Sequence, residues 1–391
     1  MVKNNLKEAQ PMQLAIYGAK SLALGMYRAI EKLYPEEECI GFVVNSRKCN
    51  PSTLAGLPVI EMEELKERIA FENRDGLHIL VCTPEDLHPE ISAYLEENGF
   101  STYTCMNSKK EAKLMEDYFV AIDEFKSLHR LPSCANGYDD MVVTETDKFN
   151  HTKDSASTPS LHVYQAKFYK DRPLNNSYDF AGWMIPIQVG AALTDIRVTD
   201  VCDNQGDNIS EKNVNYCELT ALYWMWKNKL IGAGDSEDYY GLFHYRRILD
   251  ISEEDIRRIA ANDIDIVVSY PTLHEPDIVE HHARYIPEGD WEAMLAALEE
   301  LYPDYREAYN TIFSQEYMYN YNMMVAKKSV LKDYCDWLFP ILERTEELST
   351  PKGWERKDRY IGYLGENLMT LYFFYNKDKY NIAHTGRIML T

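Results

Sequence analysis

The N-terminal third of the chain alternates short apolar runs with segments of helical pattern. Apolar runs at 13–18, 39–45 and 78–84 predict buried strands, whereas 21–33 and 90–100 carry apolar residues at helical spacing. Strands that alternate with helices over such short distances form a parallel sheet with crossover helices. This region therefore predicts a Rossmann-like α/β domain.

The turn after the first strand is where a Rossmann-like domain would bind a dinucleotide. The usual pattern there is GxGxxG, whose glycines let the backbone approach a pyrophosphate. This chain keeps Gly18, but Lys20 and Ala23 stand at the other two glycine positions. The departure disfavours an NAD(P)-dependent enzyme, although Lys20 could contact a phosphate at the helix N-terminus. The alternative is a turn that binds no ligand.

A polar stretch separates this region from a second one. Residues 131–159 are rich in Ser, Thr, Asp and Asn and lack periodicity, apart from a short run at 141–146 that could form a strand. We therefore expect a Rossmann-like domain at 1–130, a linker at 131–159 and a second α/β domain at 160–391. In the second domain the patterns predict strands at 161–168, 239–245, 264–269 and 321–326, and helices at 211–230, 252–261, 290–301, 328–346 and 358–376.

Composition and charge narrow the classes of partner. The 391 residues suffice for two domains, and a hydrophobic content of 45% is that of a globular protein. A net charge of −22 disfavours nucleic-acid partners, which need a basic face, and attraction to an anionic membrane surface. The eight cysteines include no CxxC pair, and no apolar run is long enough to span a bilayer. Since the N-terminus also lacks the apolar core of a signal peptide, we expect a cytoplasmic protein.

The segment 239–247, YYGLFHYRR, is the sharpest chemical signal in the second domain. As a strand it would carry His244 near its carboxyl end, followed by Arg246 and Arg247. Ligands of open α/β sheets bind at the carboxyl ends of strands, and paired arginines hold a diphosphate by charge-assisted hydrogen bonds. The alternative is a surface arginine pair bonded to nearby acidic residues.

A second polar segment, DNQGDNIS at 203–210, combines turn-forming residues with carboxylates. These groups could hold ribose or sugar hydroxyls; the alternative is a loop whose Asx side chains bond their own backbone. The aromatic helix expected after this segment adds a glutamate and a lysine that core packing does not explain. The candidate donor-binding residues are Asp203, Asn204, Asp207, Asn208, Glu218, Lys227 and Arg247.

Asp263 and Asp265 form a DxD pattern at a predicted strand. Such a pair can bridge Mn²⁺ or Mg²⁺ to a diphosphate, which makes these ions candidate cofactors and the two aspartates candidate metal ligands. This DxD precedes its strand instead of ending it. The alternative is therefore the chance recurrence of a three-residue pattern.

The last predicted helix, 358–376, carries Arg359 and Glu366 on one polar stripe. Gly362 and Gly365 inside this helix each cost about 1 kcal/mol relative to alanine, which indicates the close approach of another group. A carboxylate can take the proton of an attacking hydroxyl, and Glu366 is our candidate general base. The alternative is a structural network between Arg359 and Glu366.

The segment 317–328 presents Asn320 and Asn322 among tyrosines. Amide side chains can hydrogen-bond the hydroxyls of a sugar. We therefore take Asn320, Asn322 and Arg359 as candidate acceptor-binding residues. The alternative is an aromatic-rich approach to a strand.

Several blocks of the second region resemble a known family. PIQVGAALTD, DNQGDNISEKN, YYGLFHYRR, YNYNMMVAKK and RYIGYLGENL are similar to a bacterial family catalogued as domain of unknown function 4422. The resemblance covers about residues 160–391 and implies a GT-A-like glycosyltransferase of capsule, exopolysaccharide or O-antigen synthesis, some members transferring galactose or galactofuranose. In that fold the DxD ends the central strand, a place held here by HYRR. Gly-Glu-Asn at 365–367 resembles the acidic motif in which such enzymes keep the base.

The resulting hypothesis is a cytoplasmic glycosyltransferase, a hexosyltransferase that uses a UDP-linked sugar. His244 and Arg246 would act with Glu366 in catalysis. The acceptor would be a glycan or a lipid-linked glycan, and a partner protein could supply transient membrane contact. Two alternatives stay open: a non-catalytic module that binds sugar nucleotides or glycans, and an NAD(P)-dependent sugar oxidoreductase.

Overall fold

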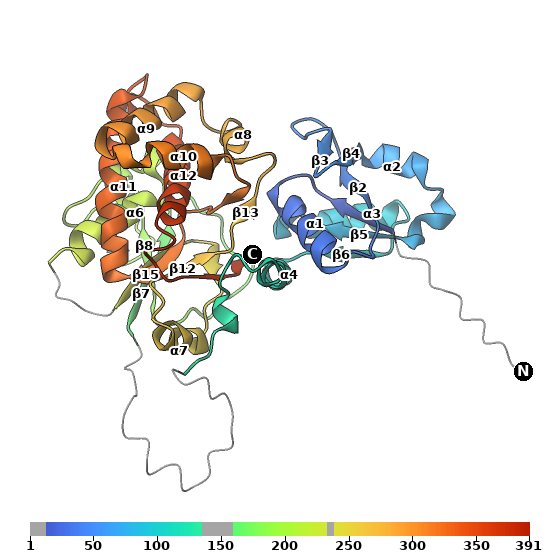
Figure 1. The fold of residues 1–391 in the computed structure, drawn as a ribbon, viewed down its shortest axis with the longest axis horizontal. Coiled ribbons are helices and arrows are strands. Elements are labelled where there is room, and N and C mark those ends of the chain that lie inside the picture. Colours follow the sequence, from blue (N-terminus) through green and yellow to red (C-terminus); the bar gives the residue numbers. More distant parts are fainter. Residues whose placement is uncertain (1–12, 135–158, 233–237) are drawn as a thin grey trace, which may run out of the picture. The chain divides into compact units, whose positions relative to one another are not determined.

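A computed structural model of the chain describes residues 13–134, 159–232 and 238–391. The chain divides into two compact units, Met1–Ile122 and Asp123–Thr391, which we describe separately (Figure 1). The linker expected at 131–159, with its short strand at 141–146, lies almost wholly outside the described residues.

The N-terminal unit is a six-stranded sheet with helices, as the alternating pattern predicts. The strand order is β3-β4-β2-β1-β5-β6, and every pairing except β3 with β4 is parallel. The expected strands and the two expected helices are all present. The elements are β1 Gln13–Tyr17, α1 Ser21–Leu33, β2 Cys39–Val44, β3 Thr53–Leu54, β4 Leu57–Glu61, α2 Met62–Arg68, β5 Leu77–Val81, α3 His88–Glu97, β6 Tyr103–Cys105 and α4 Ser108–Ile122.

The turn between β1 and α1 is set by Gly18. Its φ of +124° lies in the region that favours glycine, and a Cβ there would stand 2.6 Å from the carbonyl oxygen of Cys82. The Lys20 ammonium donates to the carbonyl oxygen of Cys49. In this structure Lys20 therefore bonds a neighbouring loop of its own unit.

The C-terminal unit contains a nine-stranded mixed sheet. Its order is β16-β12-β15-β10-β7-β8-β9, and β11 pairs with both β10 and β17. Strand β15 is antiparallel to both β10 and β12, so β10, β7, β8 and β12 all end at the same edge. The strands of this sheet are β7 Leu161–Lys167, β8 Met184–Gln188, β9 Val201–Cys202, β10 Tyr239–His244, β11 Arg247–Leu249, β12 Ile266–Ser269, β15 Met324–Lys327, β16 Ile382–Thr385 and β17 Arg387–Met389. Strands β13 Thr272–Leu273 and β14 Tyr317–Met318 form a separate two-stranded sheet.

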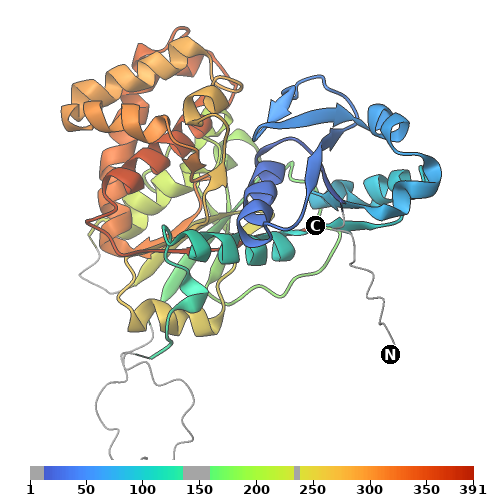
Figure 2. The same cartoon turned by 45° about the vertical axis from the view of Figure 1, so that its right-hand side comes forward.

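Helices cover both faces of this sheet (Figures 1 and 2). Alternate residues of β10 and β15 point to opposite faces: Leu242 and Met324 join the core under α6, α9, α11 and α12, whereas Phe243 and Val325 join the core under α7. The C-terminal unit therefore has three layers. Its helices are α5 Asn213–Tyr216, α6 Leu219–Met225, α7 Glu253–Ala261, α8 Ile278–His282, α9 Glu288–Leu301, α10 Arg306–Phe313, α11 Lys328–Leu348 and α12 Tyr360–Tyr375.

The helix expected at 211–230 is broken, which corrects the prediction. Cys217 adopts φ 51° and ψ −130° between α5 and α6, and the segment Trp226–Leu230 is π-helical. The side-chain amide of Asn213 donates to the carbonyl oxygen of Cys217 over 2.7 Å, which ties α5 to the break. The strand expected at 321–326 begins only at Met324, after two residues of positive φ.

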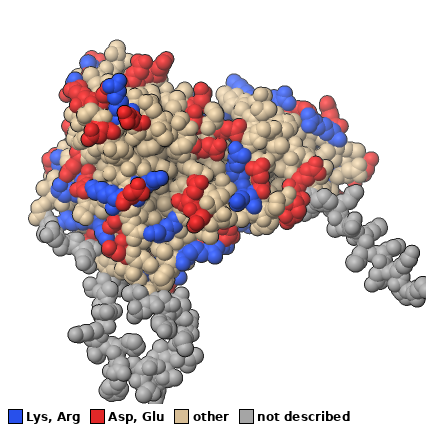
Figure 3. Space-filling view, viewed as in Figure 1, with Lys and Arg blue, Asp and Glu red and all other residues tan. Residues whose placement is uncertain are grey.

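The distribution of surface charge and the lengths of the apolar helices bear on the classes of partner considered above. On the face shown in Figure 3, acidic and basic side chains are interspersed, without a continuous basic stripe. Among the described residues, no helix is both long enough and apolar enough to cross a membrane.

Candidate functional site

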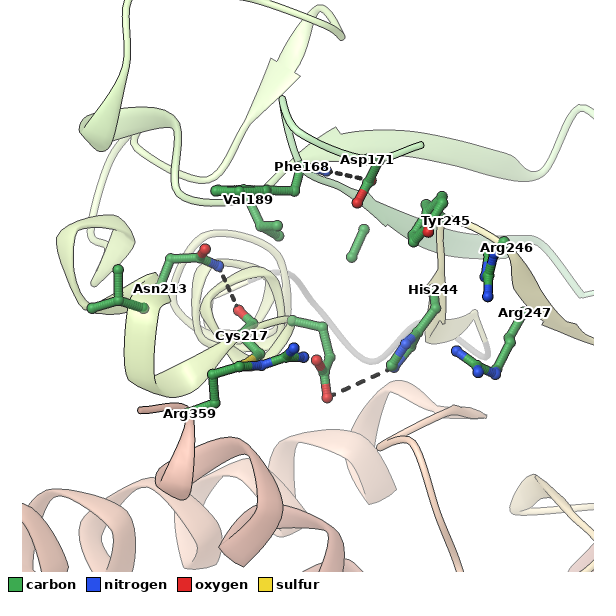
Figure 4. A pocket seen from close by; sticks show the side chains of 13 residues that line it. Phe168, Asp171, Val189, Asn213, Cys217, His244, Tyr245, Arg246, Arg247 and Arg359 are labelled. Carbon is green, nitrogen blue, oxygen red and sulfur yellow. Dashed lines mark hydrogen bonds and ion pairs between the residues drawn. The ribbon is translucent and has the colours of Figure 1, made fainter. Parts of the chain in front are cut away.

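A cavity of about 490 Å³ opens at the carboxyl ends of β7, β8 and β10 (Figure 4). This is the edge at which open α/β sheets bind their ligands. These strands run in the same direction, so their carboxyl ends meet at this edge, and β7 and β10 are followed by polar residues, among them Asp171 and Arg246. The lining residues are Ala166, Phe168, Asp171, Val189, Asn213, Val214, Cys217, Glu218, His244, Tyr245, Arg246, Arg247 and Arg359.

Three arginines face this cavity. Arg246 and Arg247 follow β10, in the tight turn that pairs His244 with residue 247 of β11. The turn is fixed from outside: the Leu390 amide donates to the carbonyl oxygen of Arg246 over 2.9 Å. Figure 4 shows Arg359 across the cavity from Arg247. The predicted arginine pair therefore lies in a pocket, joined by a third guanidinium.

Arg359 reaches the cavity from a loop that is held rigidly. Its own φ is 68°, at the residue before α12, and its Nε lies 3.2 Å from the Cys217 sulfur. Asn215 donates to the carbonyl oxygens of Gly353 and Arg356 over 2.7 and 2.9 Å. These bonds tie the loop before α12 to α5, and so fix where Arg359 enters the pocket.

Glu218 and His244 lie together on the floor of the pocket. The Glu218 Oε1 accepts from the Asn322 amide over 2.7 Å and lies 3.7 Å from His244 Nε2. That same nitrogen is 2.6 Å from the carbonyl oxygen of Tyr321, which can only accept, so His244 donates there. Burial is the main cause that lowers the pKa of His244. The imidazole is therefore neutral near pH 7.

Glu366, on α12, is the second carboxyl group of this region. It is half-buried, and burial, followed by the charge of Glu218, raises its pKa to about 8. A backbone hydrogen bond from Tyr321 and the charges of Arg247 and Arg359 act in the opposite direction. A carboxyl with such a pKa can exchange a proton near neutral pH.

Strained backbone gathers around this pair of carboxyls. Cys217, Tyr321, Asn322 and Arg359 all have positive φ, which side chains other than glycine adopt rarely. Such strain persists only where surrounding contacts enforce it, and it concentrates at functional sites. Nothing in the sequence pattern predicts the positive φ at these four positions, although Asn322 and Arg359 are candidate acceptor-binding residues.

The glycines of α12 are explained by packing against α5 and α6. A Cβ on Gly362 would stand 3.2 Å from the Cys217 sulfur, and one on Gly365 would stand 2.6 Å from Cδ1 of Leu219. Asn322 also packs against Gly365. The close approach that the glycines predict is therefore the contact that brings Glu366 near Glu218.

Asp203 lies outside the lining of the pocket. The side chain is fully buried and accepts from the Gly190 and Ala191 amides over 2.8 and 3.0 Å. Two hydroxyls, from Ser210 and Thr220, donate to it over 2.5 and 2.6 Å. Asp203 therefore joins the end of β8 to the start of α6, instead of facing the cavity as expected.

The other predicted donor residues of this loop also lie off the pocket lining. Asn208 bonds its own backbone, with Nδ2 donating to Gly206 over 2.8 Å and Oδ1 accepting from Ser210 over 3.2 Å, as the Asx alternative predicts. The Lys227 ammonium stacks 3.4 Å from the centre of the Trp226 ring. The predicted donor-binding residues that do not line the cavity are Asp203, Asn204, Asp207, Asn208 and Lys227, and the candidate base Glu366 is not among the lining residues either.

Asp263 and Asp265 lie at the opposite edge of the sheet. They precede β12, which runs in the same direction as β10, so they are remote from its carboxyl end. Lys327 pairs with both, with its Nζ 2.8 Å from Asp265 Oδ1. Across the described ranges, no cluster of three or more His, Cys, Asp or Glu suited to a metal ion is present. The pair expected to bind Mn²⁺ or Mg²⁺ thus binds a lysine.

The two predicted acceptor asparagines lie behind the pocket. Asn322 is fully buried and bonds Glu218, as described above. Asn320 donates to the Thr272 hydroxyl over 2.7 Å, and its Oδ1 has no partner among the residues that the structure describes. Sequence reasoning missed the lining residues Asp171 and Asn213, although Asp171 follows a predicted strand and could have been found by that rule.

Comparisons with known proteins assign the chain to a family. Residues 177–377, just over half of the chain, match the family described as domain of unknown function DUF4422, and the chain belongs to that family. Among solved structures, it is similar to the apo form of WbbM, a bifunctional glycosyltransferase, with 27% identity and a TM-score of 0.51. The match covers 59% of this chain and 45% of that one, less than half of its length. No curated protein matches.

Proposed function

We propose that this protein is a glycosyltransferase that moves a hexosyl group from a UDP-linked sugar to a glycan. The observation that carries the proposal is the convergence of Arg246, Arg247 and Arg359 on one cavity, beside two carboxyl groups. Similarity to a bifunctional glycosyltransferase supports it. The family resemblance favours galactose or galactofuranose as the sugar, in the synthesis of a surface polysaccharide.

The arginines would hold the diphosphate of the donor. Guanidinium groups bind phosphate oxygens by bidentate, charge-assisted hydrogen bonds. When the bond between the anomeric carbon and the diphosphate oxygen breaks, that oxygen keeps the electron pair. Fixed cations then stabilise the charge that develops on the leaving group, without having to reorganise.

Glu366 would act as the general base. It takes the proton from the acceptor hydroxyl as the oxygen forms its bond to the anomeric carbon. The charge of Glu218 would keep Glu366 basic, and the hydrogen bond from Asn322 holds Glu218 in position. His244 stays neutral and orients the turn at Tyr321 through its donated hydrogen bond.

The metal ions suggested by the DxD pattern do not fit the residues present. Asp263 and Asp265 are bonded to Lys327 at the edge away from the pocket, and Asn381 also donates to Asp265 over 2.8 Å. We therefore derive no step through Mn²⁺ or Mg²⁺ at these aspartates. The arginines would neutralise the charge of the diphosphate instead.

Donor binding tests the proposal directly. We would measure thermal shifts with UDP-, GDP-, CMP- and dTDP-sugars, with and without Mn²⁺, for the wild type and for Arg246→Ala. Loss of charge-assisted hydrogen bonds costs about 1.5–3 kcal/mol, so Arg246→Ala should weaken donor binding about tenfold or more. Arg306→Ala, an exposed arginine on α10, is the matched control. No shift with any donor would overturn the proposal.

A further inference from the structure

A series of aromatic rings runs from the end of β13 to α12. The rings of His274 and His281 are tilted with centres 3.6 Å apart, and the Tyr285 ring is 5.3 Å from that of His281. Tyr363, on α12, lies 6.1 Å from Tyr285. The rings therefore connect two elements that are far apart in sequence, through the segment that contains α8.

This series ends beside the proposed reaction centre. Tyr363 precedes Glu366 by one turn of α12, and it acts electrostatically on Arg359. Strands β12 and β10 end at the same edge of the sheet, and β13, which His274 follows, comes shortly after the end of β12 along the chain. A molecule lying along the rings would place its end near Glu366.

Cationic groups accompany the rings. Arg284 and Arg387 both act electrostatically on His274, whose pKa burial lowers to about 2, so that His274 itself stays neutral. Arg387 lies 4.9 Å from the Tyr321 ring, which Arg247 of the donor pocket also contacts at 4.7 Å. Positive charge thus continues from the donor arginines to the rings.

Solvent can reach the outer part of this surface. Arg284 is exposed, and the Tyr285 side chain is 53% exposed. Exposed tyrosine rings offer a flat apolar face and a hydroxyl, which suits contact with sugar rings. Exposed arginines suit phosphate or carboxylate groups.

We propose that His281, Arg284, Tyr285, Tyr363 and Arg387 form the acceptor track, which binds a glycan that carries an anionic group. The rings pack against the sugars, and the arginines bind the anion, either a phosphate that links the glycan to a carrier or the carboxylate of a uronic acid. This inference rests on the proposed glycosyltransferase function. It adds the charge and the location of the acceptor.

Three probes test the acceptor track: octyl β-galactoside, octyl β-glucuronide and galactosyl octyl diphosphate. Binding of each to the full chain would be measured by saturation-transfer NMR and titration calorimetry, without donor. We expect one or both anionic probes to bind at least about tenfold more tightly than the neutral one, the size of a charge-assisted contact. Preference for the diphosphate indicates a carrier-linked glycan, and preference for the glucuronide indicates a uronic acid.

Arg284→Ala should remove the preference for anionic probes, and Tyr285→Ala should weaken all three. Arg306→Ala and Tyr375→Ala are the matched controls, because Arg306 is exposed and Tyr375 is 42% exposed on other surfaces. Equal binding of the three probes by the wild type, or a preference that survives Arg284→Ala, would overturn the acceptor track.

Donor binding separates this inference from the function on which it rests. Arg284→Ala should keep the thermal shift with UDP-sugars, since Arg284 does not line the donor pocket. If donors bind and the probes are not distinguished, the acceptor track fails alone. If the probes are distinguished as expected and no nucleotide sugar binds, the glycosyltransferase proposal fails alone.

Discussion

The carboxyl group of Glu366 has an unusual protonation equilibrium for a glutamate. Burial is the main cause that raises its pKa to about 8 from an ordinary value of 4.5, and the charge of Glu218 adds to the effect. The folded protein thus disfavours the charged form. Between these two pH values unfolding releases a proton, so stability decreases as pH rises through that window.

Glu366→Gln should remove this loss, because glutamine resembles the neutral carboxyl. At about pH 8.5 the variant should have a free energy of unfolding at least ~1.4 kcal/mol above that of the wild type, the equivalent of one pKa unit. At about pH 4 the two should be equally stable. Urea unfolding at both pH values checks this, and a difference that does not change with pH would contradict the buried-charge explanation.

The same substitution should abolish most of the transfer. Without a base the acceptor hydroxyl keeps its proton in the transition state, so turnover should fall by about 100-fold or more. Wild-type kcat/KM should rise with pH to a plateau, with a midpoint near the Glu366 pKa of about 8. Radiolabelled sugar transfer measures both. Donor binding serves as the control, and turnover that persists with intact donor binding would assign the base elsewhere.

Asp203 illustrates which residues the sequence could not assign. Its four donors come from residues 190, 191, 210 and 220, and no local pattern predicts that they meet. The positions of His244, Arg246 and Arg247 could be predicted, because the alternating pattern alone indicates a strand and where it ends. Whether a loop carboxylate binds a ligand or bonds the protein itself depends on residues that are far away in the sequence, so a local pattern cannot distinguish the two roles.

Removing the Asp203 carboxylate should therefore destabilise the fold. Asp203→Ala leaves buried amides and hydroxyls without an acceptor, and each such group costs about 1–3 kcal/mol. We expect a loss of about 3 kcal/mol or more in urea unfolding, against a change within about 0.5 kcal/mol for the exposed Asp200→Ala. A small loss with Asp203→Ala would favour a ligand role for this residue.

At the scale of elements, regular strands and helices could be predicted and their interruptions could not. Helices α7, α9, α11 and α12 lie where periodicity places them, because an apolar stripe must face the core. The break at Cys217 has no glycine or proline to announce it, and its positive φ is enforced by Asn213 and by α12. The break shapes the pocket, because Glu218, which lines the cavity, directly follows Cys217.

Contact between α12 and α6 should be sensitive to a single methyl group. Gly365→Ala would place a Cβ 2.6 Å from Leu219, and overpacking of this kind costs about 1–3 kcal/mol. Gly289→Ala is the matched control, since Gly289 is helical with open space around it and should gain up to about 1 kcal/mol. Thermal unfolding of both variants gives the comparison, and equal effects would show that α12 can move away from α6.

At the scale of the molecule, each unit has its own hydrophobic core. One cluster is built on β1, β2 and β5 of the N-terminal unit, and the others on the mixed sheet of the C-terminal unit. Alternation of strands and helices predicts both sheets, but not the reversed strand β15, because a four-residue strand carries no sign of its direction. That reversal is what places the end of β12 beside the end of β10.

Separate cores predict that the chain does not unfold in a single step, and its tryptophans offer a way to see this. All six, at 183, 224, 226, 291, 337 and 354, lie in the C-terminal unit. Tryptophan fluorescence therefore reports on that unit alone, whereas far-UV circular dichroism reports on both.

A UDP-sugar at 100 times its dissociation constant should stabilise only the unit that binds it, by about 2.7 kcal/mol. We expect the fluorescence transition in urea to shift by that amount and part of the circular dichroism transition to stay in place. Arg246→Ala should cancel the shift. If the donor shifted the whole circular dichroism transition together with the fluorescence transition, the two cores would unfold as one cooperative unit. If the donor shifted only the part of the circular dichroism transition that fluorescence does not report, the nucleotide sugar would bind outside the arginine pocket.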